Sequence, residues 1–367
     1  MSTKKDKFSS KDKNFMKLAL NLARACKGLT GENPPVGCVI VKNNEIISIG
    51  QTSRNGRPHA EQNAIKNSLD DLRGSKMYVT LEPCNHYGKT PPCTSKIIKS
   101  GISEVFYSMN DIDKKVKGKS FKLLMNKNIK VKRGLLIKEA IDLYDSYKIN
   151  RIHKLPYVTG KIAISKNKIM YSENIKRITN SISDKLSHYL RFKNDGIMVS
   201  SKTLNIDNSK LNCRLKGYEK FSPKRIIIDK NLKIKLNSYV FKTAKKNNTL
   251  IFHNSKDRIK IKILRKKGIN LFKSKLYKRE YLDLKMILKK LYSLGINNLL
   301  VEGGNELTKN FFQRKLFNRF FLFENSINLP KRGEYLNFTS QKLLNEIFNT
   351  KTKTSWLAKD KITIYKR

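Results

Sequence analysis

Four side chains between Pro58 and Cys93 have the types and spacing of a catalytic zinc site. His59, Cys84 and Cys93 supply one imidazole and two thiolates, which are ligands that Zn²⁺ takes in proteins. Glu61 follows the histidine by two residues and can carry protons beside the metal without binding it. A catalytic zinc keeps its fourth position open, so three ligands suit catalysis. The segment therefore predicts hydrolysis at a metal centre.

The expected local elements place these side chains at chain positions that favour anions. We expect a helix over 60–67 that begins next to His59, a strand over 77–81 that ends before Cys84, and a helix over 94–99 that begins next to Cys93. The amino end of a helix stabilises negative charge, including that of a thiolate. Bound zinc lowers the pKa of its water, and Glu61 can pass the proton first to a ring nitrogen and then to departing ammonia.

Another interpretation of the same residues is a structural metal site. In that case His86 would be a fourth ligand and would close the open position, or the spacing of the four residues would be accidental. A structural site predicts no exchangeable water at the metal.

The spacing of the two cysteines departs from the common pattern of zinc base deaminases. In that pattern His-x-Glu is followed by Pro-Cys-x-x-Cys. Here eight residues separate Cys84 from Cys93, and the insert contains Asn85, His86 and Tyr87. Because both of its ends are held at ligands, the insert must lie over or beside the pocket. Its polar groups are therefore candidates for substrate contacts.

The whole chain has the pattern of an α/β protein with two domains, which we expect at 1–153 and 154–367. Strands alternate with helices in both halves. In the first half we expect a helix over 15–26, a hairpin of strands 36–41 and 46–49, further strands over 104–108 and 129–133, and helices over 120–125 and 137–149. In the second half we expect strands over 157–164, 196–200, 225–228, 249–252, 298–301 and 320–323, an edge strand over 361–365, helices over 182–192, 281–294 and 307–314, and a long functional loop over 205–223.

The chain is strongly basic. Its 367 residues include 78 Lys and Arg against 29 Asp and Glu, a formal net charge of +49. Such a charge predicts salt-sensitive, sequence-independent affinity for nucleic acid. Lysines are spread over nearly every expected loop and helix, however, and form no single stripe that could follow a phosphate backbone. A compositional bias and a functional polyanion surface are both compatible with this pattern, and no specific nucleic-acid partner is expected.

The remaining features favour a cytoplasmic protein with reduced thiols. The amino-terminal segment has no apolar core of the kind found in secretory signals, and no apolar run is long enough to cross a membrane. Three of the five cysteines, Cys26, Cys38 and Cys213, have no spacing that suggests a disulfide framework. Cys38 lies in an apolar run and is expected to be a small buried side chain.

Three motifs of the first half resemble the deaminase half of the bifunctional riboflavin-biosynthesis deaminase/reductases. They are Asn33-Pro-Pro-Val-Gly37, Pro58-His-Ala-Glu61, and Thr80-Leu-Glu-Pro-Cys-Asn-His-Tyr-Gly-Lys-Thr-Pro-Pro-Cys93. The resemblance implies a cytidine-deaminase-like fold, zinc on His59, Cys84 and Cys93, Glu61 as proton carrier, and Asn33 and His86 at the substrate. The implied substrate is 2,5-diamino-6-(5-phosphoribosylamino)pyrimidin-4-one.

The second half resembles the reductase domain of the same family, which is similar to dihydrofolate reductase in fold. The similarity lies in Pro156 to Ser165, Ser200 to Asp207, and Leu300-Val-Glu-Gly-Gly-Asn-Glu-Leu307. It implies reduction of the ribosyl group to a ribityl chain by NADPH. The implied cofactor-binding residues are Ala163, Arg177, Thr203, Asp207, Gly303 and Gly304, and the implied substrate-binding residues are Lys161, Arg191, Leu211, Arg214 and Glu302.

The glycine pair of the last motif can also be explained by physical chemistry alone, as a phosphate-binding turn. Paired Gly303 and Gly304 between a strand and a helix would let a phosphate approach backbone N–H groups at the start of the helix. A tight turn without a ligand has the same pattern.

The second half also departs from the family pattern. Lys166-Asn167-Lys168 follows the first strand in place of Leu-Asp-Gly, and Arg177 takes a position where tryptophan is usual. Two other functions are therefore left open: a deaminase whose second domain is only a scaffold, and a base deaminase that acts on RNA. We also expect the chain to form a homo-oligomer.

Overall fold

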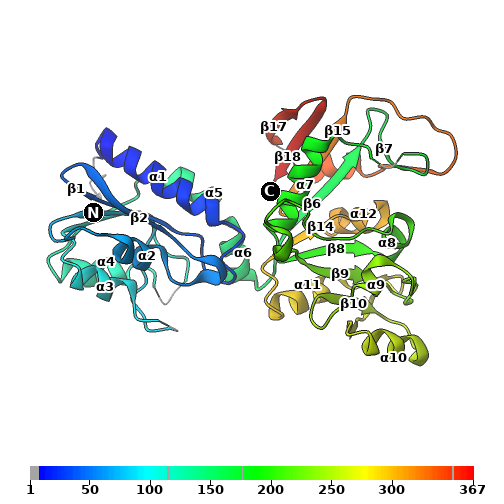
Figure 1. Ribbon diagram of the computed structural model, residues 1–367, viewed down its shortest axis with the longest axis horizontal. Helices are drawn as coiled ribbons and strands as arrows, with labels where there is room; N and C mark the ends of the chain where they lie inside the picture. Colours follow the sequence, from blue (N-terminus) through cyan, green and yellow to red (C-terminus); the bar gives the residue numbers. More distant parts are fainter. Residues whose placement is uncertain (1–7, 89, 114–115, 176, 349–350) are drawn as a thin grey trace. The chain divides into compact units, whose positions relative to one another are not determined.

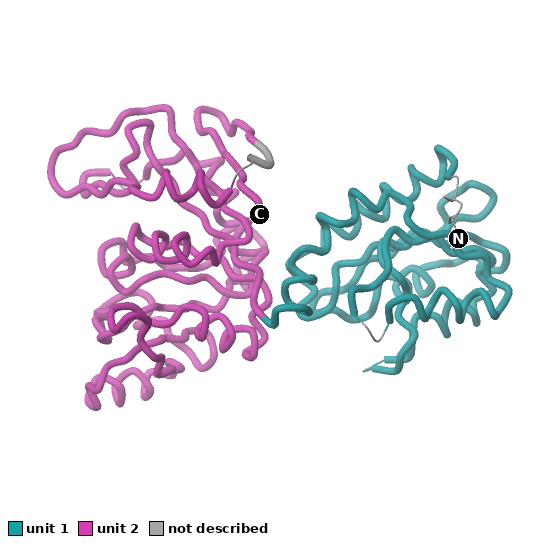
Figure 2. Tube along the Cα trace, turned by 180° about the vertical axis from the view of Figure 1, so that it is seen from behind, with its two compact units in different colours: residues 1–154 teal, residues 155–367 magenta. Residues whose placement is uncertain are grey.

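The chain folds into two compact units, residues 1–154 and 155–367 (Figure 2). The structure is a computed structural model that describes residues 8–88, 90–113, 116–175, 177–348 and 351–367. The boundary that we placed after residue 153 lies one residue before this division. The polar stretch 150–154 is largely the end of helix α6 (Asp145–His153) rather than an extended linker.

Unit 1 is a five-stranded sheet with helices on both faces. Figure 1 shows α1 and α5 on one face and α2, α3 and α4 on the other. The strand order is β2-β1-β3-β4-β5, in which β1 is antiparallel to β2 and β3 while β3, β4 and β5 are parallel. The elements are α1 (Ser10–Cys26), β1 (Gly37–Lys42), β2 (Glu45–Gln51), α2 (Ala60–Asn67), β3 (Lys76–Leu81), α3 (Cys93–Lys99), β4 (Glu104–Met109), α4 (Lys119–Met125), β5 (Lys130–Arg133), α5 (Ile137–Leu143) and α6.

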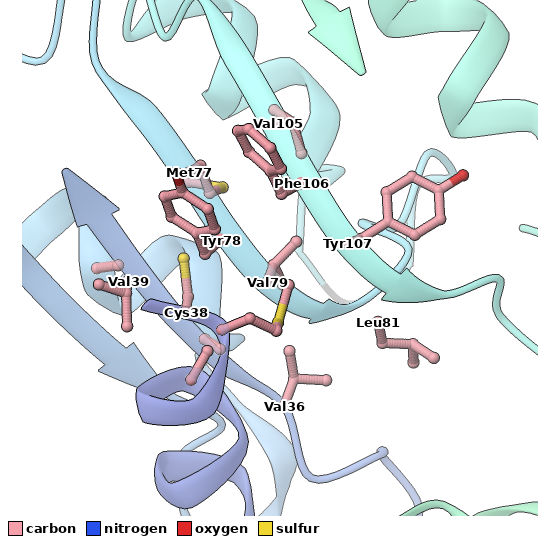
Figure 3. Packing of buried hydrophobic residues seen from close by; sticks show 14 of the residues in the cluster. Val36, Cys38, Val39, Met77, Tyr78, Val79, Leu81, Val105, Phe106 and Tyr107 are labelled. Carbon is pink, nitrogen blue, oxygen red and sulfur yellow. The ribbon is translucent and has the colours of Figure 1, made fainter. Parts of the chain in front are cut away.

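The central strands of unit 1 are apolar on both sides because helices cover both faces. Figure 3 shows how side chains of β1, β3 and β4 pack between these layers. The rings of Tyr78 and Phe106 stack with their centroids 4.5 Å apart. Cys38 is fully buried among these residues, which confirms that it is a small core side chain.

Two glycines allow helices to lie close to this sheet. A Cβ atom on Gly37 would lie 1.9 Å from the carbonyl oxygen of Ala19 in α1. A Cβ atom on Gly50 would lie 2.3 Å from the carbonyl oxygen of Ala60 in α2. The second contact positions the helix that carries Glu61.

Unit 2 is built on a nine-stranded sheet of order β11-β10-β9-β8-β14-β6-β15-β18-β17. The pairs from β11 to β15 are parallel, and β18 is antiparallel to both β15 and β17. Its elements are β6 (Tyr157–Ile164), β7 (Ile169–Ser172), α7 (Ser181–Phe192), β8 (Gly196–Ser200), α8 (Ser201–Asp207), β9 (Lys224–Ile228), α9 (Tyr239–Lys242), β10 (Thr249–His253), α10 (Arg258–Lys266), β11 (Asn270–Lys273), β12 (Leu276–Tyr277), β13 (Tyr281–Leu282), α11 (Leu284–Ser293), β14 (Asn298–Val301), α12 (Asn305–Gln313), β15 (Arg319–Asn325), β16 (Tyr335–Asn337), α13 (Gln341–Ile347), β17 (Lys351–Leu357) and β18 (Asp360–Lys366).

Successive strand residues of unit 2 belong to two cores on opposite faces of the sheet. Met198 packs in one core, whereas Ile197 and Val199 pack in the other. Leu300 likewise lies on the face opposite to that of Leu299 and Val301. This alternation is the period of two residues that a strand imposes.

Several expected elements of the chain differ from the structure. The helix expected over 15–26 begins five residues earlier, at Ser10, because Ser9 caps it. The helix over 137–149 is two helices that meet at Tyr144, where the backbone is no longer helical. The helix over 281–294 begins only at Leu284, because Tyr281 and Leu282 pair with β12 and Asp283 caps the helix. Strand 361–365 is not an edge strand, because β17 pairs with its outer side. The loop over 205–223 begins later, because α8 continues to Asp207 and Ser200 caps that helix.

Within the described residues, no helix combines the length and the apolar character that crossing a bilayer requires.

Candidate active sites

Three elements of unit 1 bring the expected metal ligands together. His59 is the residue before α2, and Glu61 lies in the first turn of that helix. Cys84 follows β3, and Cys93 is the first residue of α3. The ligands therefore come from ordered segments whose positions are set by the sheet.

The three ligand atoms are spaced as a tetrahedral zinc site requires. His59 Nδ1 lies 3.6 Å from Cys84 Sγ and 3.4 Å from Cys93 Sγ. Zinc bonds of about 2.3 Å to sulfur and about 2.0 Å to nitrogen place tetrahedral ligand atoms roughly 3.5 Å apart. Among the described residues, the cluster of candidate ligand atoms within 4.8 Å of one another contains His59, Cys84 and Cys93 but not His86. The donor set fits zinc with one position open.

The two thiols have opposite tendencies to ionise in the protein. The backbone N–H of Cys93 donates to Cys84 Sγ over 3.3 Å. Hydrogen bonds from Cys93 and His59 lower the pKa of Cys84 despite its burial, whereas the neighbouring Cys84 and burial raise the pKa of Cys93. Cys84 is therefore the thiolate of the pair, and a bound cation would favour ionisation of both.

Glu61 is a buried carboxyl group beside the thiols. Only 4 % of the surface of this residue is exposed to solvent. Burial raises the pKa of Glu61 to about 7, although the nearby His59 opposes this rise. A carboxyl group that exchanges protons near neutral pH is suited to general acid–base catalysis.

A cavity of about 120 Å³ opens on these residues. Asn33 and His86, which were expected at the substrate, line it together with His59, Glu61 and Cys84. The insert lies beside this cavity, as expected, and Gln62 in α2 donates to the Pro91 carbonyl over 3.1 Å. Lys89 of the insert lies outside the described residues.

Several residues of this cavity were not found from the sequence. Arg57, Asp111, Asp113 and Arg151 line it. Asp111 accepts a hydrogen bond from the Tyr147 hydroxyl over 3.1 Å, and burial raises the pKa of this aspartate. Arg57 donates to the Thr90 hydroxyl and so contacts the insert. These residues come from three separate segments, and no spacing in the sequence connects them.

A larger cavity of about 290 Å³ lies in unit 2. Its lining includes seven of the residues that the family resemblance implied, namely Lys161, Ala163, Thr203, Asp207, Glu302, Gly303 and Gly304. The backbone N–H of Gly304 donates to Thr203 Oγ1 over 3.1 Å, which joins the start of α12 to α8. Met170, Tyr171 and Leu336 add an apolar wall from β7 and β16, two strands that we did not expect.

A buried ion pair stands beside this cavity. Arg191 donates to both carboxylate oxygens of Glu302, over 3.0 and 2.7 Å. Burial alone would raise the pKa of Glu302, but Arg191 and Lys161 lower it overall. Burial lowers the pKa of Lys161, an effect that Glu302 opposes. The cavity therefore contains an ionised carboxylate and a lysine with a weakened hold on its proton.

The other expected residues of unit 2 are not part of the lining of this cavity. Arg191 donates to the backbone carbonyl of Asn212 over 3.2 Å. Arg214 donates to the side-chain Oδ1 of the same residue over 3.0 Å. Leu211 precedes Asn212 and is buried. Arg177 does not line the cavity; it pairs with Asp184 over 3.2 Å and its side chain is 68 % exposed.

Two family models match the chain. Residues 9–109 match the cytidine and deoxycytidylate deaminase zinc-binding region. Residues 157–357 match the RibD C-terminal domain. The first match contains all three candidate zinc ligands, and the second covers most of unit 2.

Known proteins are similar over nearly the whole chain. The riboflavin biosynthesis protein RibD of Aquifex aeolicus is 36 % identical over 314 residues, which cover 85 % of this chain and 86 % of that protein. RibD of Actinobacillus pleuropneumoniae is 36 % identical over 311 residues, which cover 84 % and 82 % of the two chains.

A solved structure of a protein from Thermotoga maritima is similar to nearly the whole of this chain. That protein is a diaminohydroxyphosphoribosylaminopyrimidine deaminase/5-amino-6-(5-phosphoribosylamino)uracil reductase. It is 28 % identical to this chain, with a TM-score of 0.81 and coverage of 97 % of this chain and 98 % of the other.

Proposed function

The chain belongs to the RibD family of bifunctional deaminase/reductases of riboflavin biosynthesis, and from this membership we propose its substrates, its cofactors and the roles of its residues. The first substrate is 2,5-diamino-6-(5-phosphoribosylamino)pyrimidin-4-one, which unit 1 deaminates. The deaminated product is then reduced in unit 2 with NADPH, so that the ribosyl group becomes a ribityl chain. The two reactions are those in the name of the Thermotoga maritima protein.

The observation that carries the deaminase proposal is the open three-ligand cluster beside a buried carboxyl group. His59, Cys84 and Cys93 would hold zinc. When bound, zinc acts as a Lewis acid that makes water a stronger nucleophile near neutral pH. The cavity beside the cluster gives a pyrimidine ring access to this position.

Glu61 carries the protons of the deamination. It accepts a proton from the attacking water and gives it to a ring nitrogen. It then takes the proton of the hydroxyl group that has formed on the ring carbon and gives it to the amino group, which leaves as ammonia while that carbon becomes a carbonyl. Its burial keeps the carboxyl group out of bulk water, and its pKa near neutrality allows both directions of transfer. Asn33 and His86 line the cavity and orient the ring.

The cavity of unit 2 supports a second, reductive activity. NADPH, when bound, supplies a hydride. The paired Gly303 and Gly304 and the side chain of Thr203 line the cavity where the cofactor phosphates would lie, at the start of α12. Lys161 and Glu302 line the same cavity and orient the sugar. A domain that served only as a scaffold would need no such set of convergent polar side chains.

Further proposals concern location and association. We place the protein in the cytoplasm, where reducing conditions keep thiols free, and none of its five cysteines forms a disulfide within the described residues. We also propose self-association, because strand β17 is an edge of the large sheet and its Trp356 is 64 % exposed. An exposed edge strand is a site for pairing with another chain.

One experiment separates the two activities. The zinc-loaded protein is incubated with the phosphoribosylaminopyrimidine, with and without NADPH, and the products are followed by mass spectrometry. We expect exchange of an amino group for oxygen without NADPH, and the further addition of two hydrogen atoms with it. Failure of the first step would reject the deaminase proposal. Deamination without any NADPH consumption would leave unit 2 as a scaffold.

A further inference from the structure

Unit 2 contains a second large cavity, which lies apart from the residues that the resemblance implied. Its volume is about 430 Å³, and it lies between α12 and the hairpin of β12 and β13. Tyr277, Lys278, Glu280, Tyr281, Glu306, Lys309, Asn310, Gln313 and Arg314 line it. Glu306 also lines the 290 Å³ cavity, so the two cavities are neighbours along α12. We call it the α12 cavity.

One wall of the α12 cavity is aromatic. Tyr277 and Tyr281 are direct partners across the hairpin, so their side chains project from the same face. Both rings remain partly open, at 39 % and 37 % exposure. The guanidinium of Arg314 lies 4.2 Å from the centre of the Tyr277 ring. Such a wall can hold a planar ring by stacking.

Two residues that line the cavity each have a buried side-chain atom without a hydrogen-bond partner among the described residues. Arg314 donates to Asp283 over 2.8 Å through Nη2, while its Nη1 is buried and has no hydrogen-bond partner among the described residues. Asn310 is only 8 % exposed, and its Oδ1 also lacks a partner there. The two residues are four positions apart on α12 and therefore neighbours on one face. A buried polar atom without a partner is costly, and a bound molecule would remove that cost.

These atoms define the ligand by its chemistry. Arg314 Nη1 needs an acceptor and Asn310 Oδ1 needs a donor, and a cyclic amide offers a carbonyl and an N–H side by side. The tyrosines require that this amide belong to a planar ring. Lys278 and Lys309 add positive charge to the lining, which would attract a phosphate group. The carboxylates of Glu280 and Glu306 add negative charge, which offsets part of this attraction.

We propose that the α12 cavity binds a pyrimidine nucleotide of the uracil type, with the cyclic amide on Asn310 and Arg314 and the ring against the tyrosines. The site is separate from the cofactor cavity but shares Glu306 with it. A ligand there would contact the helix whose first turn borders the cofactor cavity. The site does not depend on the activity proposed for unit 2.

Uridine 5′-monophosphate tests this proposal in titration calorimetry with the zinc-loaded, full-length protein. We expect one saturable binding event that Asn310→Ala weakens by at least about tenfold, because the amide loses its buried partner. Tyr277→Leu should weaken the same event. Ribose 5-phosphate, which lacks the ring, should bind far more weakly. The variant Asn310→Ala should keep the thermal midpoint and the deamination rate of the unchanged protein.

Three outcomes would overturn the proposal. One is the absence of any saturable heat that depends on Asn310. Another is equal binding of ribose 5-phosphate and the nucleotide, which would mean that the ring is not recognised. The third is displacement of the nucleotide by NADPH in direct competition, which would make the α12 cavity an extension of the cofactor site.

Discussion

At the level of single residues, unit 1 places one protonatable group beside three ligating atoms. Glu61 lies in the first turn of α2, and His59 directly precedes the same helix. The two roles therefore depend on different atoms of one short segment. Substitutions can separate metal binding from proton transfer.

Replacement of Glu61 by glutamine should stop proton transfer and leave the metal site intact. The amide has nearly the same size but cannot accept and return a proton. We expect the deamination rate to fall by roughly 10² to 10⁴-fold, with unchanged zinc content. Rates from mass spectrometry and metal analysis test this. Glu45→Gln, at an exposed position of β2, is the matched control, and a loss of less than tenfold in Glu61→Gln would contradict the assigned role.

Replacement of Cys93 by serine should remove zinc. A hydroxyl group is a much poorer zinc ligand than a thiolate at neutral pH. Dialysed protein should contain far less than one zinc per chain, measured by elemental analysis. Cys213→Ala removes a buried thiol of unit 2 and should leave the zinc content unchanged. Retention of a full zinc by Cys93→Ser would show that Cys93 is not a ligand.

At the level of elements, the close approach of α2 to β2 sets the depth at which Glu61 lies. A Cβ atom on Gly50 would be 2.3 Å from the Ala60 carbonyl oxygen and 2.4 Å from the Ala64 nitrogen. Both are backbone atoms, so a larger side chain at residue 50 can be accommodated only if the helix moves.

Gly50→Ala should destabilise unit 1 and reduce deamination together. Overpacking of this kind costs about 1 to 3 kcal/mol of unfolding free energy, and a displaced α2 would misplace Glu61. Urea denaturation and the deamination rate measure the two effects. Glu45→Ala on the same strand should change neither. Normal stability of Gly50→Ala would mean that α2 has more freedom than its contacts indicate.

His188 in helix α7 should make the stability of unit 2 dependent on pH. Burial, Arg191 and Arg214 lower the pKa of His188 to about 4, although Glu302 and a hydrogen bond with the Asn212 backbone oppose them. Neutral His188 accepts a hydrogen bond from the Arg214 backbone N–H over 3.2 Å at Nδ1. Because the pKa is lower in the folded state, this contribution to stability is complete above pH about 6.5 and is lost as the pH falls towards 4.

His188→Gln should therefore flatten the pH dependence of unfolding. We expect the urea midpoint of the unchanged protein to fall more between pH 7 and pH about 5 than that of the variant. Unit 2 can be followed by the fluorescence of Trp356, the single tryptophan of the chain. Parallel pH profiles of the two proteins would show that His188 does not titrate in this way.

At the level of the whole molecule, each unit has its own sheet, core and cavity. The core of unit 1 is formed by residues of that unit, and the two cores of unit 2 by residues of the other. The zinc cluster lies wholly in unit 1, and the 290 Å³ cavity lies wholly in unit 2. The two reactions therefore have separate structural requirements.

Removal of zinc by a chelator should abolish deamination and spare reduction. When the deaminated product is supplied directly, we expect NADPH oxidation at an unchanged rate, measured by absorbance. Restored zinc should recover deamination. Loss of reduction on chelation would mean that unit 2 depends on the metal site of unit 1.

The sequence by itself predicted the candidate metal ligands, the candidate proton carrier and most of the fold. His59, Glu61 and Cys93 lie at expected helix starts and Cys84 follows an expected strand, so their geometry depends mainly on local structure. The helices and strands follow from apolar periodicity, which is also local. Errors occurred where the pairing of two strands defines the element. Tyr281 pairs with Tyr277 in a short hairpin, and β17 pairs with β18, which therefore is not an edge strand.

Only the tertiary structure decided what surrounds these residues. Arg57, Asp111 and Arg151 reach the first cavity from segments far apart in the chain, and β7 and β16 supply a wall of the second. The α12 cavity depends on a hairpin and a helix that the chain brings together only on folding. Contacts of this kind produce no periodic pattern in a sequence. They depend on how whole elements pack and not on the spacing of residues that are neighbours in the chain.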